Sequence, residues 1–520
     1  MSANAQLKKS APNKGPEKKN GLFNRFLNTV EAAGNRLPHP VTLFIIFALA
    51  VIVISEIASR AGLTVTFYDA KFKTDKTIQA VSLMTPEGLR FMLHTATKNF
   101  TSFAPLGTVL VAMLGVGVAE GTGLIGAALK KAVLSTPSRL ITAMVVFAGV
   151  MSNVASDAGY VVLVPLGAIV FISFKRHPLA GLAAAFAGVS GGFSANLLVG
   201  TLDPLLSGIT NEALAASGMT ETILPTANYF FMFVSTILIT VLGTWVTEKI
   251  VEPRLGEYKG GAHDDESMTV TKEEKKGLVA AGLSLLVFAA VMLFLTVPEN
   301  ALLRVDGELN DFTHYGLVPT IMLFFLIPGL AYGMASGTVR NDKDVVKFMS
   351  KSMSTMGGYL VLSFFAAQFI KYFGYTNLGT ILAVSGASFL ESIGFVGFPL
   401  VVAFILVAGF INLFIGSASA KWGIMAPVFV PMMAKLGFSP AFTQLAYRIG
   451  DSTTNIISPL MSYFAIIVVF AQKYDEDSGI GTLISTMLPY SLVFLIGWTI
   501  LLGIWYVAGF PIGPDAFIAM

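Results

Sequence analysis

The chain has 520 residues, of which 54% are hydrophobic and only 12% charged, and its formal net charge is +3. Soluble domains carry about 25% charged residues. This composition, with several apolar runs long enough to cross about 30 Å of hydrocarbon, predicts a helical protein that spans the membrane many times. The lack of cysteine excludes disulfides and thiolate metal sites, and the five histidines have no metal-binding spacing. No phosphate-binding glycine loop is present, which argues against direct use of ATP.

The first half of the chain begins with a polar, basic tail at residues 1–37, which the positive-inside rule places in the cytoplasm. A mixed segment at 59–98 is expected on the outer side, and the charged loop at 248–276 is expected in the cytoplasm. Spans of this half are predicted at 41–57, at 104–129, from residue 179 onward, and at 228–246.

The stretch 140–173 is too short for two full spans. It has about 34 residues, whereas two spans need about 40 residues plus a turn. Basic residues stand at both ends, Arg139 before it and Lys175 after it, so both ends belong in the cytoplasm. Its middle, Ser152 to Gly159, is small and polar. We therefore predict a re-entrant helical hairpin with its tip near the middle of the membrane. Two ordinary spans with a short outer loop are the alternative.

The second half shows the same order of features. A cytoplasmic loop is predicted at 340–351, a short helix at 378–390, and a second hairpin at 399–436 that enters from outside because Lys and Arg are scarce at its flanks. The remaining spans are predicted at 278–297, 318–335, 357–373, 441–470 and 482–507. The count is about nine spans, with the C-terminus on the outer, periplasmic side.

The two halves share few identical residues, but their predicted elements follow in the same order: span, short helix, hairpin and broken helix. Asn196 aligns with Asp451, and Pro204 aligns with Pro459, at similar offsets. We predict an all-α polytopic membrane protein whose two opposed hairpins and two broken helices form an inverted repeat, an arrangement found in secondary transporters. The first half is divided into a tail (1–37), a scaffold (38–138) and a core (139–247). A loop (248–276) joins it to the second half, which has its own scaffold (277–392) and core (393–520).

Polar residues gather where each repeat is expected to break. The second broken helix is predicted to be interrupted at 450–455, beside Arg448 and Asp451, and irregular backbone at this depth marks a cavity or a protein-lined site. The coupling ion, Na⁺ or H⁺, is expected at two half-sites that offer hard oxygen ligands. The residues of the first half-site are Asn153, Asn196 and Asp203, and those of the second are Asn412, Ser417, Ser419, Asp451 and Asn455, with Na⁺ placed at Asn153, Asn196 and Asp203 and at Asn412 and Asp451.

The substrate is expected to bind in the second half, at Asn412, Ser417, Ser419, Trp422, Pro440, Arg448 and Pro459. Three side chains of this region suit an aromatic anion. Arg448 offers a bidentate clamp for a carboxylate, Lys421 a second cation, and Trp422 a ring for stacking. Two of them have a plainer interpretation: Arg448 and Asp451, three residues apart on a helix, neutralise each other, and Trp422 is a packing residue. Asn412 alternatively bonds a carbonyl of a neighbouring helix.

Long motifs in this sequence resemble the AbgT family of p-aminobenzoyl-glutamate transporters, which includes drug exporters. They include H-P-L-A-G-L-A-A-A-F-A-G-V-S-G-G-F-S-A-N at 177–196, G-T-L-D-P-L-L at 200–206, F-I-N-L-F-I-G-S-A-S-A-K-W at 410–422 and A-Y-R-I-G-D-S at 446–452. The resemblance implies a homodimer in the bacterial inner membrane, with nine spans and two hairpins. It also implies functional roles for Asp203, Asn412, Ser419, Trp422, Pro440, Arg448, Asp451 and Pro459.

The resulting hypothesis is an ion-coupled secondary transporter of p-aminobenzoyl-glutamate-like aromatic anions, an efflux pump for sulfonamide antimetabolites, or both. The alternative is a Na⁺-coupled dicarboxylate or citrate transporter of the same architecture. An intramembrane enzyme would need the carboxyl groups of Asp203 and Asp451 to nearly touch, and the repeat places them in separate half-sites. No enzyme activity, no cofactor other than the coupling ion, and no nucleic-acid partner are expected.

Overall fold

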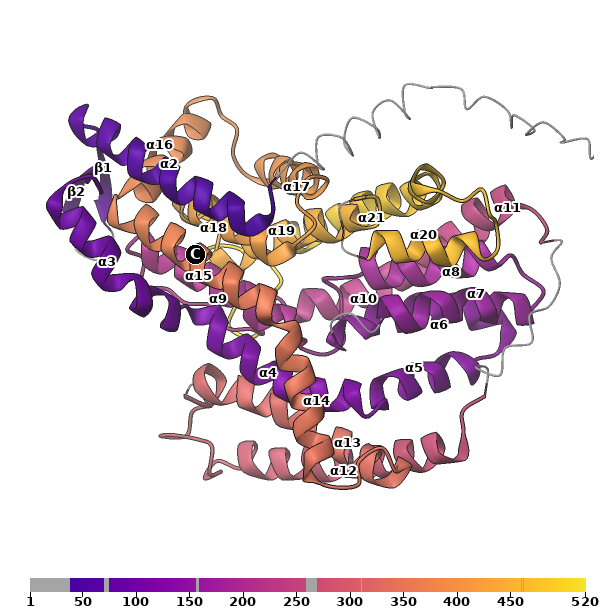
Figure 1. Ribbon diagram of the computed structural model, residues 1–520. Helices are drawn as coiled ribbons and strands as arrows, with labels where there is room; N and C mark the ends of the chain where they lie inside the picture. Colours follow the sequence, from indigo (N-terminus) through magenta and orange to yellow (C-terminus); the bar gives the residue numbers. More distant parts are fainter. Residues whose placement is uncertain are drawn as a thin grey trace, which may run out of the picture.

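The computed structural model describes residues 38–69, 74–155, 159–258, 269–309, 311–459, 461 and 463–520 as a bundle of helices (Figure 1). Within those residues, six helices are long and apolar enough to cross a membrane, or up to eight if each of two bent pairs counts as one span. The chain is therefore a multi-span helical membrane protein, as its composition predicts. The predicted tail at 1–37 lies outside the described residues.

Helices are found where most spans were predicted. They are α2 (Pro40–Arg60), α10 (Tyr229–Val246), α12 (Lys272–Thr296), α13 (Leu317–Ser336), α15 (Gly357–Tyr375) and α21 (Ile480–Ala508). Their ends follow local sequence signals. Pro40 begins α2 behind the cap His39, and Thr271 and Glu274 form a capping box at the start of α12.

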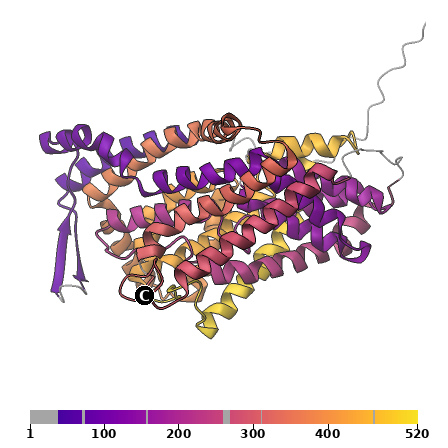
Figure 2. The same ribbon diagram turned by 90° about the horizontal axis from the view of Figure 1, so that it is seen from below.

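The outer segment and the second span differ from the prediction. The segment holds an antiparallel hairpin of β1 (Thr64–Asp69) and β2 (Thr74–Gln79), which projects from one end of the bundle (Figure 2), so the protein is not purely α-helical. The span is longer than predicted, because α3 (Pro86–Thr101) continues into α4 (Ala104–Gly121) as one candidate span. It then breaks at Gly123, whose φ of +90° suits glycine, and α5 (Leu124–Leu134) follows.

The predicted cytoplasmic loop at 340–351 is wrong as a loop. Residues Asp342–Thr355 form helix α14, which begins at a capping box between Asn341 and Asp344. A capping box satisfies two backbone N–H groups at the start of a helix, which stabilises α14 in spite of its many charged residues. Helix α14 meets α15 at a bend of 45°.

Each predicted hairpin consists of two helical arms. In the first half they are α6 (Ile141–Ser152), with short 3-10 and π segments at 153–155 and 159–163, and α7 (Val164–Ser173). In the second half they are α17 (Phe398–Asn412) and α18 (Ala418–Lys435), preceded by α16 (Leu378–Ser392). A helix of 12 residues is about 18 Å long, well short of a membrane crossing.

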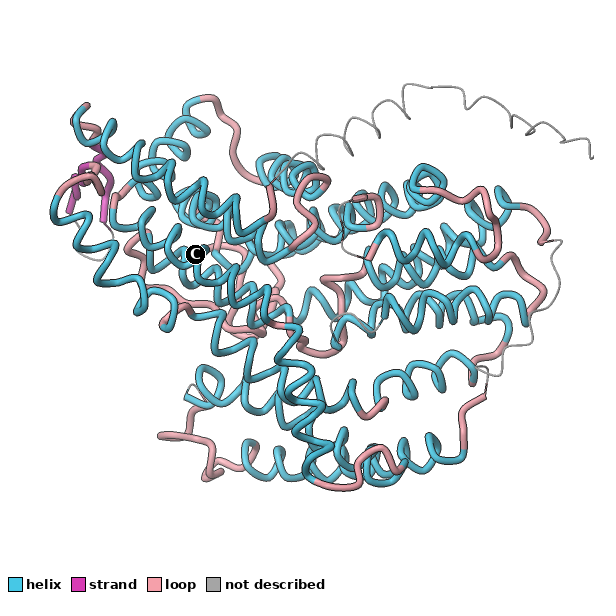
Figure 3. The backbone as a smooth tube through the Cα atoms, viewed as in Figure 1, coloured by secondary structure: helices cyan, strands magenta, loops and turns pink. Residues whose placement is uncertain are grey.

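The arms of each hairpin pack against the broken helix of their own half. In the first half, α6 packs against the π turn at Ala187–Gly191 and α7 against α8 (Pro178–Phe186). In the second half, α17 and α18 both pack against α19 (Pro440–Asn455). Loops consequently lie in the middle of the bundle as well as at its edges (Figure 3).

Both broken helices are present, but the second breaks later than predicted. The first is interrupted at 192–201, between the π turn and α9 (Leu202–Ala216). The second runs unbroken through 450–455, so the predicted interruption there is wrong, and it ends at Asn455 before α20 (Phe464–Gln472). The hydroxyls of Thr453 and Thr454 donate to carbonyls one turn back within α19, which accommodates these polar residues in a regular helix.

Candidate functional site

Four charged side chains are buried together where α9, α18 and α19 meet. Asp203 (2% exposed), Lys421 (0%), Arg448 (2%) and Asp451 (1%) all lie inside the protein. Charges at such depth must be compensated locally, and two cations against two carboxylates give a cluster with no net charge. The pairs are Arg448 with Asp203, at 2.8 Å, and Lys421 with Asp451, at 2.5 Å. The interpretation in which Arg448 and Asp451 neutralise each other is therefore not the observed arrangement.

The pair of Asp203 and Arg448 joins the two halves of the chain. Asp203 lies in the first turn of α9, where the helix N-terminus favours a negative charge, and its Oδ2 accepts the Gly200 N–H at 2.7 Å. Arg448 Nη1 lies 2.8 Å from Asp203 Oδ1. Nε and Nη1 of Arg448 make no hydrogen bond with the described residues. The charge of Asp203 therefore holds the guanidinium in place, and the N–H groups of Nε and Nη1 are available to a further ligand.

Asn412 organises the second half-site at the C-terminal end of α17. Its Nδ2 donates to the Asp451 carbonyl at 2.7 Å and to Asn455 Oδ1 at 2.8 Å, so three predicted ion-site residues do come together. Its Oδ1 accepts a short hydrogen bond from Lys421 Nζ. Asn455 Nδ2 in turn donates to Asp451 Oδ2 at 3.4 Å. Lys421, expected from the sequence to be a cation for the substrate, instead has its ammonium among the ligands expected for Na⁺.

Trp422 is completely enclosed. Its ring stacks on Tyr447 with centroids 4.4 Å apart, and its Nε1 donates to Thr210 Oγ1 at 2.9 Å. Tyr447 donates its hydroxyl to the Ala418 carbonyl at 2.7 Å. The stack therefore fixes the start of α18 against α19 in this conformation, and a substrate ring can reach it only after it is uncovered.

A buried hydrogen-bond chain, which the sequence did not reveal, continues from Trp422 through α9 to α19. Thr210 donates to Gln444 Oε1 at 2.7 Å, and Gln444 Nε2 donates to Asn228 Oδ1 at 3.0 Å. Asn228 then donates to the Ala441 carbonyl at 2.8 Å. The sequence signal that could have indicated this network is Gln444, a polar side chain in the middle of a helix whose residues are all buried.

The first half-site brings Asn153 and Asn196 to the same carbonyl. Both side-chain amides donate to the Val150 oxygen, at 3.2 and 3.3 Å. Asn153 is 7% exposed, and its Oδ1 has no hydrogen-bond partner among the described residues. Asp203 follows in the same broken segment but is held by Gly200 and by Arg448 instead.

The remaining predicted residues are spread more widely. Ser417 caps α18 by accepting the Ala420 N–H, and its hydroxyl lies 3.3 Å from that of Ser419. Pro459 is half-buried in the break after α19. Pro440 is the first residue of α19, about 16 Å along the helix from Asp451, so it lies apart from the buried charges.

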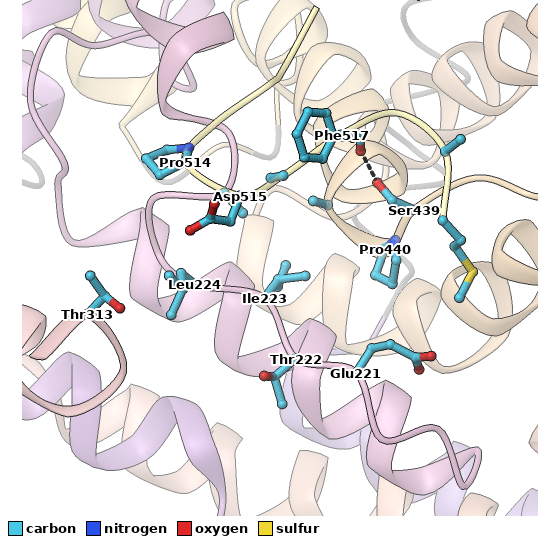
Figure 4. Close-up of a pocket in the computed structure, with 15 residues that line it drawn as sticks. Glu221, Thr222, Ile223, Leu224, Thr313, Ser439, Pro440, Pro514, Asp515 and Phe517 are labelled. Atoms are coloured by element: carbon cyan, nitrogen blue, oxygen red, sulfur yellow. Dashed lines mark hydrogen bonds between the residues drawn. The ribbon is translucent and has the colours of Figure 1, made fainter. Parts of the chain in front are cut away.

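Pro440 lines a pocket of about 600 Å³ at the start of α19 (Figure 4). The C-terminal segment borders this pocket and is fastened to the α19 cap, because Ser439 donates its hydroxyl to the Phe517 carbonyl at 2.5 Å. Glu221 and Asp515 also line it, so its carboxylates do not suit an anionic substrate.

Comparisons with known proteins identify relatives over almost the whole chain. The model of the AbgT putative transporter family matches residues 25–520. The p-aminobenzoyl-glutamate transport protein of Escherichia coli K12 is 40% identical over 497 residues, covering 94% of this chain and 96% of that protein.

Two solved structures have the same fold. The antimetabolite efflux pump MtrF of Neisseria gonorrhoeae aligns with a TM-score of 0.89 at 49% identity, over 95% of this chain and 100% of the other. The YdaH transporter of Alcanivorax borkumensis aligns with a TM-score of 0.86 at 45% identity, over 92% and 100%.

Proposed function

Because the chain belongs to the AbgT putative transporter family, we propose that it is an ion-coupled secondary transporter of p-aminobenzoyl-glutamate-like aromatic anions, an efflux pump for sulfonamide antimetabolites, or both. The family is one of transporters and not of enzymes. The substrate classes are suggested by two relatives, the p-aminobenzoyl-glutamate transport protein and the antimetabolite efflux pump.

The buried, neutral charge cluster is the observation that carries this proposal. A substrate carboxylate needs a cation, and Arg448 has donors to spare but is neutralised by Asp203. When Asp203 accepts H⁺ or Na⁺, the guanidinium loses its counter-charge and becomes free to clamp the substrate. Ion binding and substrate binding therefore favour each other, which is the requirement for coupled transport. The Trp422–Tyr447 stack supplies a flat apolar surface once the hairpin moves.

The membrane topology proposed with it has nine spans, two opposed hairpins and an inverted repeat. Close glycine contacts support the repeat. A Cβ placed on Gly188 would lie 2.3 Å from the Val146 carbonyl oxygen and 3.0 Å from Gly149 Cα, both in α6. A Cβ placed on Gly450 would lie 3.0 Å from Gly409 N. In both halves, then, the first hairpin arm meets the broken helix through a glycine pair, which lets the backbones approach closely.

The proposed setting is a homodimer in the bacterial inner membrane, with a cytoplasmic N-terminus and a periplasmic C-terminus. The positive-inside rule supports this orientation through the basic residues 8–25 of the tail. Chemical crosslinking in membranes tests the dimer, and protease accessibility of tags at the two ends tests the orientation.

Purified protein in liposomes with labelled p-aminobenzoyl-glutamate tests the function. We expect concentrative uptake under an inward Na⁺ gradient or, for an exporter, sulfonamide counterflow driven by a pH gradient alone. Arg448→Lys should lose this transport, because ammonium cannot replace a bidentate guanidinium, while Arg90→Lys at an exposed ion pair should not. Absence of both uptake and counterflow would refute the proposal. Transport of citrate in place of the aromatic anion would favour the dicarboxylate alternative.

A further inference from the structure

The Lys421 ammonium lies in a coordination shell built for a cation. Lys421 is fully buried, and its Nζ contacts Asp451 Oδ1 at 2.5 Å, Asn412 Oδ1, and the Ile415 carbonyl at 3.5 Å. A carboxylate, an amide oxygen and a carbonyl from unwound backbone at a helix end are the ligands that broken-helix transporters offer to Na⁺. Here a side chain of the same chain already occupies that shell.

We propose that the Lys421 ammonium is the resident cation of the second half-site, which consequently binds no free Na⁺. Lys421 thus determines ion specificity: if Na⁺ drives transport, it acts at the first half-site alone. The inference rests on the proposed transport function, and it assigns Lys421 a role different from that of a substrate ligand.

The surroundings hold the ammonium in place. Asn412 Nδ2 is fixed by Asp451, Thr454 and Asn455, so its Oδ1 is left to face the ammonium. The C-terminal end of α17, with its partial negative charge, lies at Asn412 and also favours a cation. Tyr447 adds its ring face, 5.9 Å from Nζ. A Na⁺ ion that entered this shell would lie in contact with the buried ammonium, and the repulsion between the two positive charges would oppose its binding.

The first half-site differs in this respect. When the hairpins are aligned on the prolines of their second arms, Pro165 and Pro427, the position of Lys421 corresponds to Gly159. Glycine provides no charge there, and Asn153 Oδ1 stays buried without a partner among the described residues. Arg448, which neutralises Asp203, comes from the opposite half. The first half-site therefore has an unused oxygen ligand and lacks a lysine of its own.

Removing the tethered ammonium should create a Na⁺ site. The experiment compares wild type, Lys421→Met, Lys421→Met/Asp451→Asn and Lys421→Arg in detergent. Lys435→Met is the matched control, because Lys435 lies on the same helix but is exposed. Thermal stability is followed against NaCl with KCl as the reference salt, and ²²Na⁺ binding is measured directly. Neither readout requires substrate, so a wrong transport assignment cannot be mistaken for a wrong ion site.

We expect Lys421→Met to gain a saturable, Na⁺-specific rise in Tm and additional bound ²²Na⁺. The gain should vanish in Lys421→Met/Asp451→Asn and be absent from Lys421→Arg and Lys435→Met. An unchanged Na⁺ response in folded Lys421→Met would overturn the proposal. If that variant does not fold, Asp451→Asn in an otherwise wild-type chain decides: unchanged ²²Na⁺ binding supports a Na⁺-free second half-site, and lost binding contradicts it.

Discussion

The ion pair between Asp203 and Arg448 gives the sharpest stability prediction. Their side chains are 3% and 2% exposed, so water does not screen the charges, and removing one partner leaves the other buried and uncompensated. Arg448→Met and Asp203→Asn should each lower the free energy of unfolding by about 3–5 kcal/mol. A difference of this size changes the unfolded fraction roughly 10²–10⁴-fold, since about 1.4 kcal/mol corresponds to a factor of ten.

The double variant should recover most of that loss. Arg448 leaves Nε and Nη1 without hydrogen bonds, so the intact pair gains less than its Coulomb attraction suggests, and an uncharged pair avoids the desolvation cost altogether. The expected coupling energy in a double-mutant cycle is therefore nearly as large as the two single-variant losses added together. Stability is measured by denaturant unfolding in detergent, followed by tryptophan fluorescence.

An exposed pair provides the control for this cycle. Glu87 and Arg90 lie 2.6 Å apart with side chains 66% and 62% exposed, and the same cycle there should give a coupling energy far smaller than that of the buried pair, because water screens the two charges. If Asp203→Asn/Arg448→Met is as unstable as the two single changes added together, the two groups do not interact, and the argument for a charge cluster that joins the halves fails.

Three further predictions concern other contacts. Trp422→Phe keeps the ring stack but loses the hydrogen bond to Thr210, and denaturant unfolding should show a loss of about 0.5–1.5 kcal/mol. Burial lowers the pKa of His177 below its usual 6.5, so the folded protein favours the neutral ring. The Tm should therefore fall as the pH drops below 6.5. The variant His177→Asn keeps an oxygen that can cap α8 and should show a smaller fall in Tm. Gly188→Ala would place its Cβ 2.3 Å from the Val146 carbonyl oxygen and should lower the free energy of unfolding by about 1–3 kcal/mol. Gly126→Ala, with open space around it, should leave stability unchanged or raise it slightly. Equal Tm values for the two variants would contradict the close helix contact.

Hydropathy and length predicted much of the fold because a membrane permits few solutions. The apolar runs form helices, and the stretch 140–173 holds two short helices, α6 with 12 residues and α7 with 10. The prediction of helix boundaries failed at two places where polar residues lie inside or at the start of a helix. The loop predicted at 340–351 is largely helix, because a capping box at Asn341 starts α14. The polar run at 450–455 is helical because its threonines bond within the helix.

The sequence by itself also singled out the charged residues that the structure buries, since charges inside apolar helices are costly and therefore noticeable. Only the tertiary structure decided their partners. Arg448 and Asp451 are three residues apart on one helix, yet each pairs with a different element, because α9 brings Asp203 and α18 brings Lys421 to α19. Periodicity reports which side chains face the interior of the bundle. Which charge they meet there depends on which helix packs against them. Arg448 meets Asp203 from 245 positions earlier in the chain, and Asp451 meets Lys421 from 30 positions earlier.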